Sequence, residues 1–174
     1  MLDPMIPGPI SDFSSHPRVL LVEDNWTNLL LARRLLEKAG YWVEIAVNGR
    51  EAVEAAKHQR FDVILMDVQM PVLDGCTASR EIRRIPGWAG RVPIIALTAS
   101  VYSEDSKRCF EAGMDDFVGK PFKPGELVRK CKEWMSRRPA EYPEQINDIQ
   151  PPAQAADPDH LAEAVSGAIG RSER

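Results

Sequence analysis

Residues 61–75 read FDVILMDVQMPVLDG. The apolar run VILM leads directly to the carboxylate of Asp67, and two turn-forming pairs, MP and DG, follow it. A short apolar run bounded by turn residues is typical of a strand that is buried on both faces, as in a parallel sheet covered by helices. This stretch therefore predicts a buried strand over 61–66 that presents one acid at its carboxyl end.

Similar apolar runs recur along the chain, each followed by a helical pattern of about ten to fourteen residues. The predicted strands are 18–22, 42–46, 61–66, 92–98 and 116–119. Strands that alternate with helices in this way indicate repeated βα units. We expect an α/β fold with a doubly wound five-stranded parallel sheet and helices on both faces, spanning residues 18–136.

Local chemistry predicts where the helices begin and end. The expected starting residues are Asn25, Asn48 (paired with Glu51), Asp74, Ser103 and Pro124, and the expected stops include Gly40 and Gly113. The first helix is predicted to carry Leu29, Ala32, Leu36 and Ala39 on one face before Gly40 ends it. The last helix carries a stripe expected to pack on the sheet, formed by Leu127, Val128, Cys131, Trp134 and Met135.

The overall composition fits one domain with length to spare. The chain has 174 residues, of which 44% are hydrophobic and 28% charged, and its net charge is −4. Acidic and basic residues are interspersed, so we expect no nucleic-acid binding by this chain alone. No apolar run approaches the roughly 20 residues of a membrane span, and the N-terminus does not resemble a signal peptide. We therefore expect a cytoplasmic protein that does not bind membranes.

The two flanks and the cysteines carry weaker signals. Residues 1–17 and 137–174 are rich in proline and small polar residues, which predicts flexible flanks; a short helix over 158–169 is one option for the tail. The three cysteines are odd in number and widely spaced, which argues against a disulfide framework. We expect them to be reduced, packed thiols.

Polar side chains stand at the carboxyl ends of four predicted strands: Glu23, Asp24, Asp67, Thr98 and Lys120. Because these ends meet at one edge of a parallel sheet, we expect the side chains to converge. Carboxylates a few ångströms apart would repel one another by about 4 kcal/mol per pair at an effective dielectric near 20. With oxygen ligands only, a hard divalent cation such as Mg²⁺ is favoured, and such a site suits a phosphoryl group.

Four motifs together resemble the receiver domain of two-component response regulators. They are VEDN (22–25), ILMDVQMPVLDG (64–75), PIIALTA (93–99) and EAGMDDFVGKPF (111–122). The wording is most similar to receivers of hybrid histidine kinases. The resemblance implies a flavodoxin-like sheet of order 2-1-3-4-5.

The resemblance also implies roles for the converging residues. Asp67 would be the phosphoacceptor, taking a phosphoryl group from a phosphohistidine on a histidine kinase or a histidine phosphotransfer protein. Glu23, Asp24, Asp67 and the backbone carbonyl of Gln69 would hold Mg²⁺, with Mn²⁺ as an alternative. Thr98 and Lys120 would bind the phosphoryl group.

Further positions match the family's supporting residues. Pro71 and Gly75 would shape the loop around the acid, Gly75 through a positive φ or a tight helix start, and Pro121 would follow a cis peptide bond that aims Lys120. Gln69 and Ser100 would tune hydrolysis of the aspartyl phosphate. Phe117 is either a switch residue that moves with Thr98 or simply part of the core.

The leading hypothesis is a signalling module, not an enzyme, whose output lies on the face made by helix 4, strand 5 and helix 5. The downstream partner stays unknown, and a homodimer stays open. One alternative is a Mg²⁺-dependent phosphohydrolase with an aspartate nucleophile, although that class usually has a second aspartate where this chain has Gln69. Another is a receiver-like scaffold that binds partners without phosphorylation.

Overall fold

Alternating apolar strands and amphipathic helices build the fold seen in the computed structural model, which describes residues 16–99 and 104–137. Several expectations lie outside these residues: the flank over 1–15, the tail from 138 with its optional helix over 158–169, Ser100, and the Ser103 cap. No helix in the described part of the chain has both the length and the apolar character needed to cross a bilayer.

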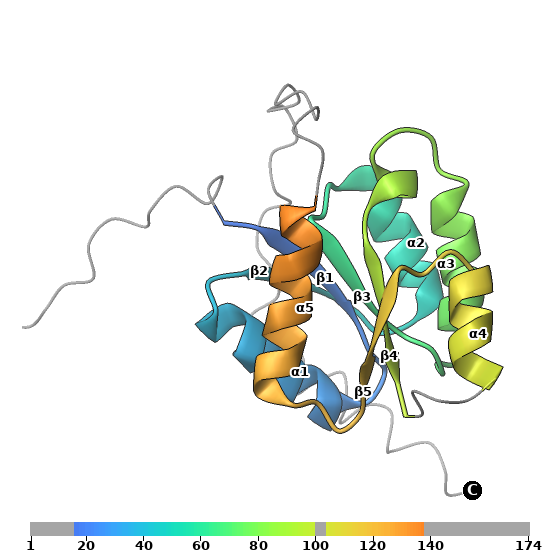
Figure 1. The fold of residues 1–174 in the computed structure, drawn as a ribbon. Coiled ribbons are helices and arrows are strands. Elements are labelled where there is room, and N and C mark those ends of the chain that lie inside the picture. Colours follow the sequence, from blue (N-terminus) through green and yellow to red (C-terminus); the bar gives the residue numbers. More distant parts are fainter. Residues whose placement is uncertain (1–15, 100–103, 138–174) are drawn as a thin grey trace, which may run out of the picture. The chain divides into compact units, whose positions relative to one another are not determined.

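The sheet has five parallel strands in the order β2-β1-β3-β4-β5 (Figure 1). The strands are β1 (Arg18–Val22), β2 (Trp42–Ala46), β3 (Val63–Asp67), β4 (Ile94–Thr98) and β5 (Asp116–Gly119). Every residue of β3 and β4 is buried, as expected for central strands covered on both faces. The predicted fold class and strand order are confirmed.

Helices cover both faces of the sheet (Figure 1). They are α1 (Trp26–Lys38), α2 (Gly49–His58), α3 (Gly75–Arg83), the short 3-10 helix η2 (Ala89–Arg91), α4 (Glu104–Glu111) and α5 (Pro124–Ser136). Leu29 and Leu36 of α1 share one buried cluster with Leu127 and Cys131 of α5. The helices α2, α3 and α4 contribute to the cluster on the opposite face.

Two strand starts differ from the prediction. The third strand begins at Val63 instead of Phe61 and extends to Asp67, and the fourth begins at Ile94 instead of Val92. Phe61 and Val92 are nevertheless buried, so their apolar character extended the predicted strands. Pro93 has no N–H to donate, and its carbonyl accepts from Ile64 N at 2.8 Å at the edge of the ladder.

The predicted helix ends are largely confirmed. Asn25, Asn48 and Asp74 accept hydrogen bonds from the first turns of α1, α2 and α3. Pro124 is the first residue of α5, and Gly113 follows α4 with a φ of 87°. Leu29, Ala32 and Leu36 of the predicted face are buried, whereas Ala39 is the exposed C-cap residue of α1.

Arg83, the last residue of α3, ties several segments together. Its guanidinium donates to the carbonyls of Gly113 and Val92 at 2.7 Å each and forms an ion pair with Asp115 at 2.7 Å.

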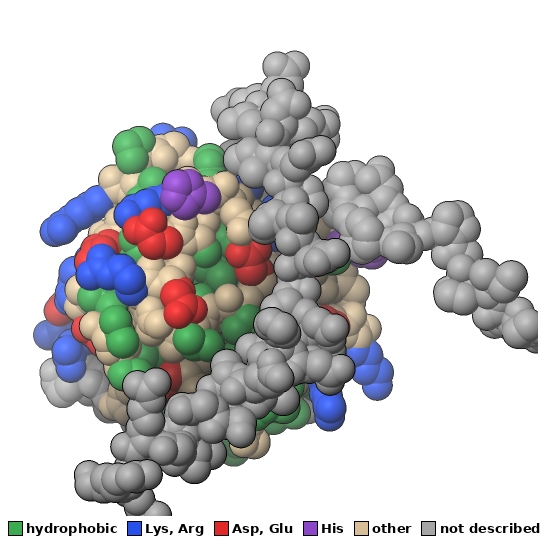
Figure 2. Space-filling view, turned by 180° about the vertical axis from the view of Figure 1, so that it is seen from behind, with side chains coloured by type: hydrophobic (Ala, Val, Ile, Leu, Met, Phe, Trp, Pro, Cys, Tyr) green, Lys and Arg blue, Asp and Glu red, His purple; other side chains and the backbone are tan. Residues whose placement is uncertain are grey.

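On the face drawn in Figure 2, Lys and Arg side chains lie among those of Asp and Glu.

Candidate phosphoacceptor site

The site residues stand where strands end. Glu23 directly follows β1, Asp67 ends β3, Thr98 ends β4, and Lys120 directly follows β5. The backbone joins two of these ends, because Lys120 N donates to Thr98 O at 2.7 Å. Glu23, Asp67 and Thr98 are all at most 5% exposed. The fold therefore brings together polar groups that lie almost 100 residues apart in the chain.

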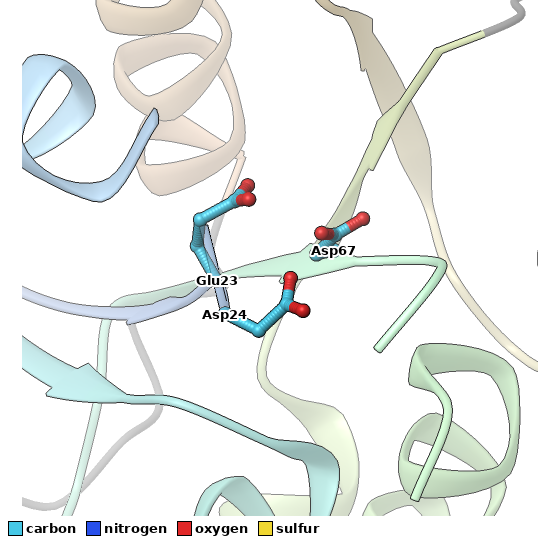
Figure 3. Close-up of side chains that lie close together, drawn as sticks. All are labelled: Glu23, Asp24 and Asp67. Carbon is cyan, nitrogen blue, oxygen red and sulfur yellow. The ribbon is translucent and has the colours of Figure 1, made fainter. Parts of the chain in front are cut away.

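Three carboxylates face one another at this edge. Glu23, Asp24 and Asp67 each offer an oxygen, and these oxygens all lie within 4.8 Å of one another (Figure 3). Asp24 is exposed, whereas Glu23 and Asp67 are buried. The predicted convergence is confirmed by this geometry.

Lys120 supplies the nearest positive charge. Its Nζ lies 2.7 Å from Glu23 Oε2 and 2.7 Å from Asp67 Oδ2. One ammonium for three ionised carboxylates leaves a formal charge of −2, so the site attracts further cations. The Lys120–Pro121 peptide bond is cis, as the resemblance implied.

The environment of Glu23 disfavours its charged form. Burial raises the pKa of the Glu23 carboxyl, and the Asp67 carboxylate adds to this rise, although hydrogen bonds from Lys120 and Asn28 lower it. Its Oε1 accepts from Asn28 Nδ2 at 3.1 Å. Among the described residues, Oε2 has the ion pair with Lys120 and no further hydrogen-bond partner.

The side chains of this site fit a hard divalent cation. The acids, Thr98 and Lys120 line one cavity of about 190 Å³, together with Gln69. The three acids offer only carboxylate oxygens as metal ligands. The buried Glu23 Oε2 can still take a further partner besides Lys120. Gln69 N also donates to Asp67 Oδ1 at 3.1 Å, which holds the loop after the acid close to it.

The loop after Asp67 approaches the strand so closely that it requires glycine. A Cβ added at Gly75 would lie 2.0 Å from the Asp67 carbonyl oxygen, and Gly75 N donates to Val68 O at 3.1 Å. Of the two roles expected for Gly75, the structure shows the tight helix start, since its φ is not positive. The positive φ, 70°, falls instead on Val72, which is 81% exposed.

Gly49 holds the other side of this loop. Gly49 N donates to Leu73 O at 3.1 Å, and a Cβ there would lie 2.4 Å from the same oxygen. The roles of Gly49 and of the Asn28 contact to Glu23 were not predicted from the sequence. An asparagine near the start of an apolar helix and a glycine after an N-cap were the only signals available.

Phe117 is half-buried in β5. Its ring packs against the core cluster and meets Phe110 edge-on, with centroids 6.1 Å apart. Lys130 Nζ lies 5.2 Å from its centroid. This position accommodates both the switch role and the core role.

Comparison with known proteins assigns the class of this protein. Residues 19–132 match the response regulator receiver domain family, and the chain belongs to that family. It is a receiver domain of two-component and phosphorelay signalling.

Two solved structures of receiver domains resemble this chain. The receiver domain of a sensor histidine kinase from Pseudomonas aeruginosa, solved with magnesium coordinated in its active-site cleft, is 45% identical. The match covers 70% of this chain and 99% of that one, with a TM-score of 0.67. The receiver domain of Saccharomyces cerevisiae Ssk1, solved with the histidine phosphotransfer protein Ypd1, is 34% identical, with a TM-score of 0.65 and coverages of 70% and 90%.

Longer curated proteins also match. Histidine kinase 5 of Arabidopsis thaliana is 37% identical over 68% of this chain, and the hybrid signal transduction protein dokA of Dictyostelium discoideum is 42% identical over 70%. The matches cover only 15% and 7% of the lengths of these two relatives.

Proposed function

We propose that this receiver domain, residues 18–136, accepts a phosphoryl group from a phosphohistidine onto Asp67. The observation that carries the proposal is the position of Asp67: it ends a fully buried strand with Lys120 Nζ at 2.7 Å. Phosphoryl transfer depends mainly on positioning and on stabilising charge. A nucleophile held on a buried strand beside an ammonium meets both needs.

The acids fit a divalent metal. Glu23, Asp24, Asp67 and the Gln69 carbonyl would hold Mg²⁺, with Mn²⁺ as an alternative. When bound, the metal neutralises charge on the phosphoryl oxygens and on the carboxylates around them. Glu23 keeps its buried carboxylate close to Lys120, and Asp24 is the exposed member of the three acids.

The remaining residues respond to the phosphoryl group. Thr98 and Lys120 would donate hydrogen bonds to it, and hydrogen bonds to charged groups contribute roughly 1.5–3 kcal/mol each. A shift from 1:99 to 99:1 between two states requires about 5.5 kcal/mol, so these bonds supply part of it. The shift would act on the α4–β5–α5 face, with Phe117 as a switch residue. Gln69 and Ser100 would set the lifetime of the aspartyl phosphate, and Pro71, Gly75 and Pro121 would hold the loops.

The proposed donor is a histidine kinase or a histidine phosphotransfer protein, in line with the hybrid kinases and the Ypd1 complex among the relatives. The domain would act in the cytoplasm as a signalling module, with no turnover of external substrates and no binding of membranes. Trp26 begins α1 beside the acids and is 55% exposed, which suits contact with a protein donor.

Incubation with Mg²⁺ and acetyl phosphate, followed by intact mass spectrometry, tests the proposal. We expect a single labile phosphoryl adduct on the wild-type chain and none on Asp67→Asn. Asp62→Asn is the matched control, since Asp62 precedes the same strand at its far end, and it should still be modified. An adduct that persists in Asp67→Asn, or continuous phosphate release from unrelated esters, would refute the proposal.

A further inference from the structure

Two cysteines meet where α3 packs beside α4. Cys76 is the second residue of α3 and Cys109 lies on α4; they are 2% and 3% exposed and belong to the same buried cluster. Their thiols are hydrogen-bonded to each other. Two hydrogen-bonded thiols are neighbours, and a disulfide bond requires their sulfurs to approach to roughly 2.05 Å.

A cavity gives small molecules access to one of these thiols. It has a volume of about 380 Å³ and is lined by Cys76, Asp74 and Arg108, together with the loop that follows Asp67. This cavity adjoins the one that holds the acids of the phosphoacceptor site, since Val68 and Gln69 line both. A thiol that lines a cavity can meet a reagent that a fully enclosed thiol cannot.

The surroundings favour the thiolate of Cys76. The hydrogen bond from Cys109 lowers the pKa of Cys76 to about 7; burial and Asp74 oppose this, and Arg108 and Arg80 support it. Cys131 provides a contrast within the same chain. It lies in the cluster on the opposite face of the sheet, and burial raises its pKa to about 12.

We propose that Cys76 and Cys109 form an oxidisable dithiol that closes to a disulfide between α3 and α4, with a low-molecular-weight disulfide as the oxidant. The Cys76 thiolate attacks one sulfur of the oxidant and releases the first small thiol. The Cys109 thiol then attacks the Cys76 sulfur of the mixed disulfide and releases the second. The protein loses two hydrogens, and the small disulfide is reduced to two thiols.

The proposal does not depend on phosphorylation of Asp67. The start of α3 is held against β3 by the close approach of Gly75 to the Asp67 carbonyl. A covalent link from Cys76 to Cys109 would place α4 under the same restraint. Amide hydrogen exchange in α4 is therefore expected to slow in the oxidised chain.

Oxidation of the full chain with oxidised glutathione near neutral pH, followed by alkylation with iodoacetamide and mass spectrometry, tests the dithiol. With urea added at the alkylation step to expose Cys131, we expect a product two hydrogens lighter that carries one alkyl group, on that cysteine. Cys109→Ala should stop at the mixed disulfide on Cys76, and Cys76→Ala should form neither product. Cys131→Ala should close the disulfide as the wild type does. Thermal unfolding followed by circular dichroism checks that each variant is folded.

Alkylation rates in the unoxidised chain provide a second measurement that needs no variant. We expect Cys76 to react faster than Cys131 in the folded protein. Equal rates for these two thiols, a disulfide that forms only after addition of urea, or a link found only between separate chains would each overturn the proposal.

Discussion

Lys120 is shared between two buried carboxylates, while the exposed Asp24 adds a third negative charge nearby. The cost of gathering these acids is offset only in part by one ammonium, so a cation should stabilise the fold. A ligand that binds the folded state alone stabilises it by about 2.7 kcal/mol at 100 times its Kd.

Mg²⁺ should therefore raise the Tm of the wild-type chain, and Asp24→Asn should lose most of that rise. The exposed position of Asp24 means that its replacement should leave the metal-free fold intact. Thermal unfolding with and without Mg²⁺ measures the effect. Glu37→Gln, an exposed acid on α1 paired with Arg33, is the control and should keep the full rise. An equal Mg²⁺ response in Asp24→Asn would show that the ion binds elsewhere.

At this scale the sequence predicted the acids and the lysine, because each follows a recognisable apolar strand. It did not predict the contact of Asn28 with Glu23, since that contact depends on how α1 leaves β1. It also left Gly49 unassigned, because the reason for that glycine lies on Leu73, which is distant in the chain. Contacts between segments are not visible in local patterns.

The first turn of α3 is capped by one titratable side chain, that of Asp74. Burial alone would raise the pKa of Asp74, but hydrogen bonds from the Thr77 hydroxyl and N–H outweigh it and lower the pKa. A carboxyl whose pKa is lowered on folding stabilises the protein above its unfolded pKa. That stabilisation is lost as the pH falls through the folded value.

Asp74→Ala should lower the free energy of unfolding by about 0.5–2 kcal/mol at neutral pH. The difference from wild type should be smaller at about pH 3 than at about pH 6, because the unfolded pKa of an aspartate is near 3.9. Urea unfolding at both pH values measures it. Asn48→Ala removes a cap that does not itself titrate, so its cost should change less with pH. A pH-independent cost for Asp74→Ala would contradict the lowered pKa.

Element types and order followed from the sequence, and the discrepancies lie at strand starts. Phe61 and Val92 are buried without belonging to the ladder, and apolar character alone does not distinguish burial from strand pairing. The strand order itself came from the family resemblance, since periodicity predicts strands but does not say which ones are neighbours.

At the scale of the whole molecule, Arg83 joins α3 to the chain around η2, β4 and β5. Arg83→Met should lower the free energy of unfolding by about 2–4 kcal/mol, because it removes the ion pair of Asp115 and takes one donor from the carbonyls of Gly113 and Val92. The free energy of unfolding of Arg83→Lys should lie between those of the wild type and Arg83→Met, since lysine keeps the charge but lacks the planar guanidinium. Urea unfolding measures both. Arg80→Met, at an exposed position of the same helix, is the control. Equal stability of Arg83→Met and Arg80→Met would contradict this role.

Two exposed tryptophans, one near the carboxyl ends of the strands and one at the start of β2, allow a matched test of binding to the protein that donates the phosphoryl group. Trp26 begins α1 at the acid-bearing edge, whereas Trp42 begins β2 at the other edge; they are 55% and 42% exposed. Trp26→Ala should slow transfer from a phosphohistidine protein roughly tenfold, equivalent to about 1.4 kcal/mol. It should leave labelling by acetyl phosphate unchanged, and Trp42→Ala should alter neither rate. Equal slowing with both donors would place the effect of Trp26 on the site itself.

The backbone contact between Gly75 and Asp67 has a mechanical consequence. Gly49 makes a similarly close contact with Leu73 on the far side of the loop. Main-chain atoms therefore fix this loop beside the acid, and they leave no space for even a methyl group at either glycine. Displacement provoked at Asp67 would then be transmitted more readily through the side chains of Thr98 and Lys120 than through this loop. The direction in which this domain transmits its signal would follow from that asymmetry in stiffness.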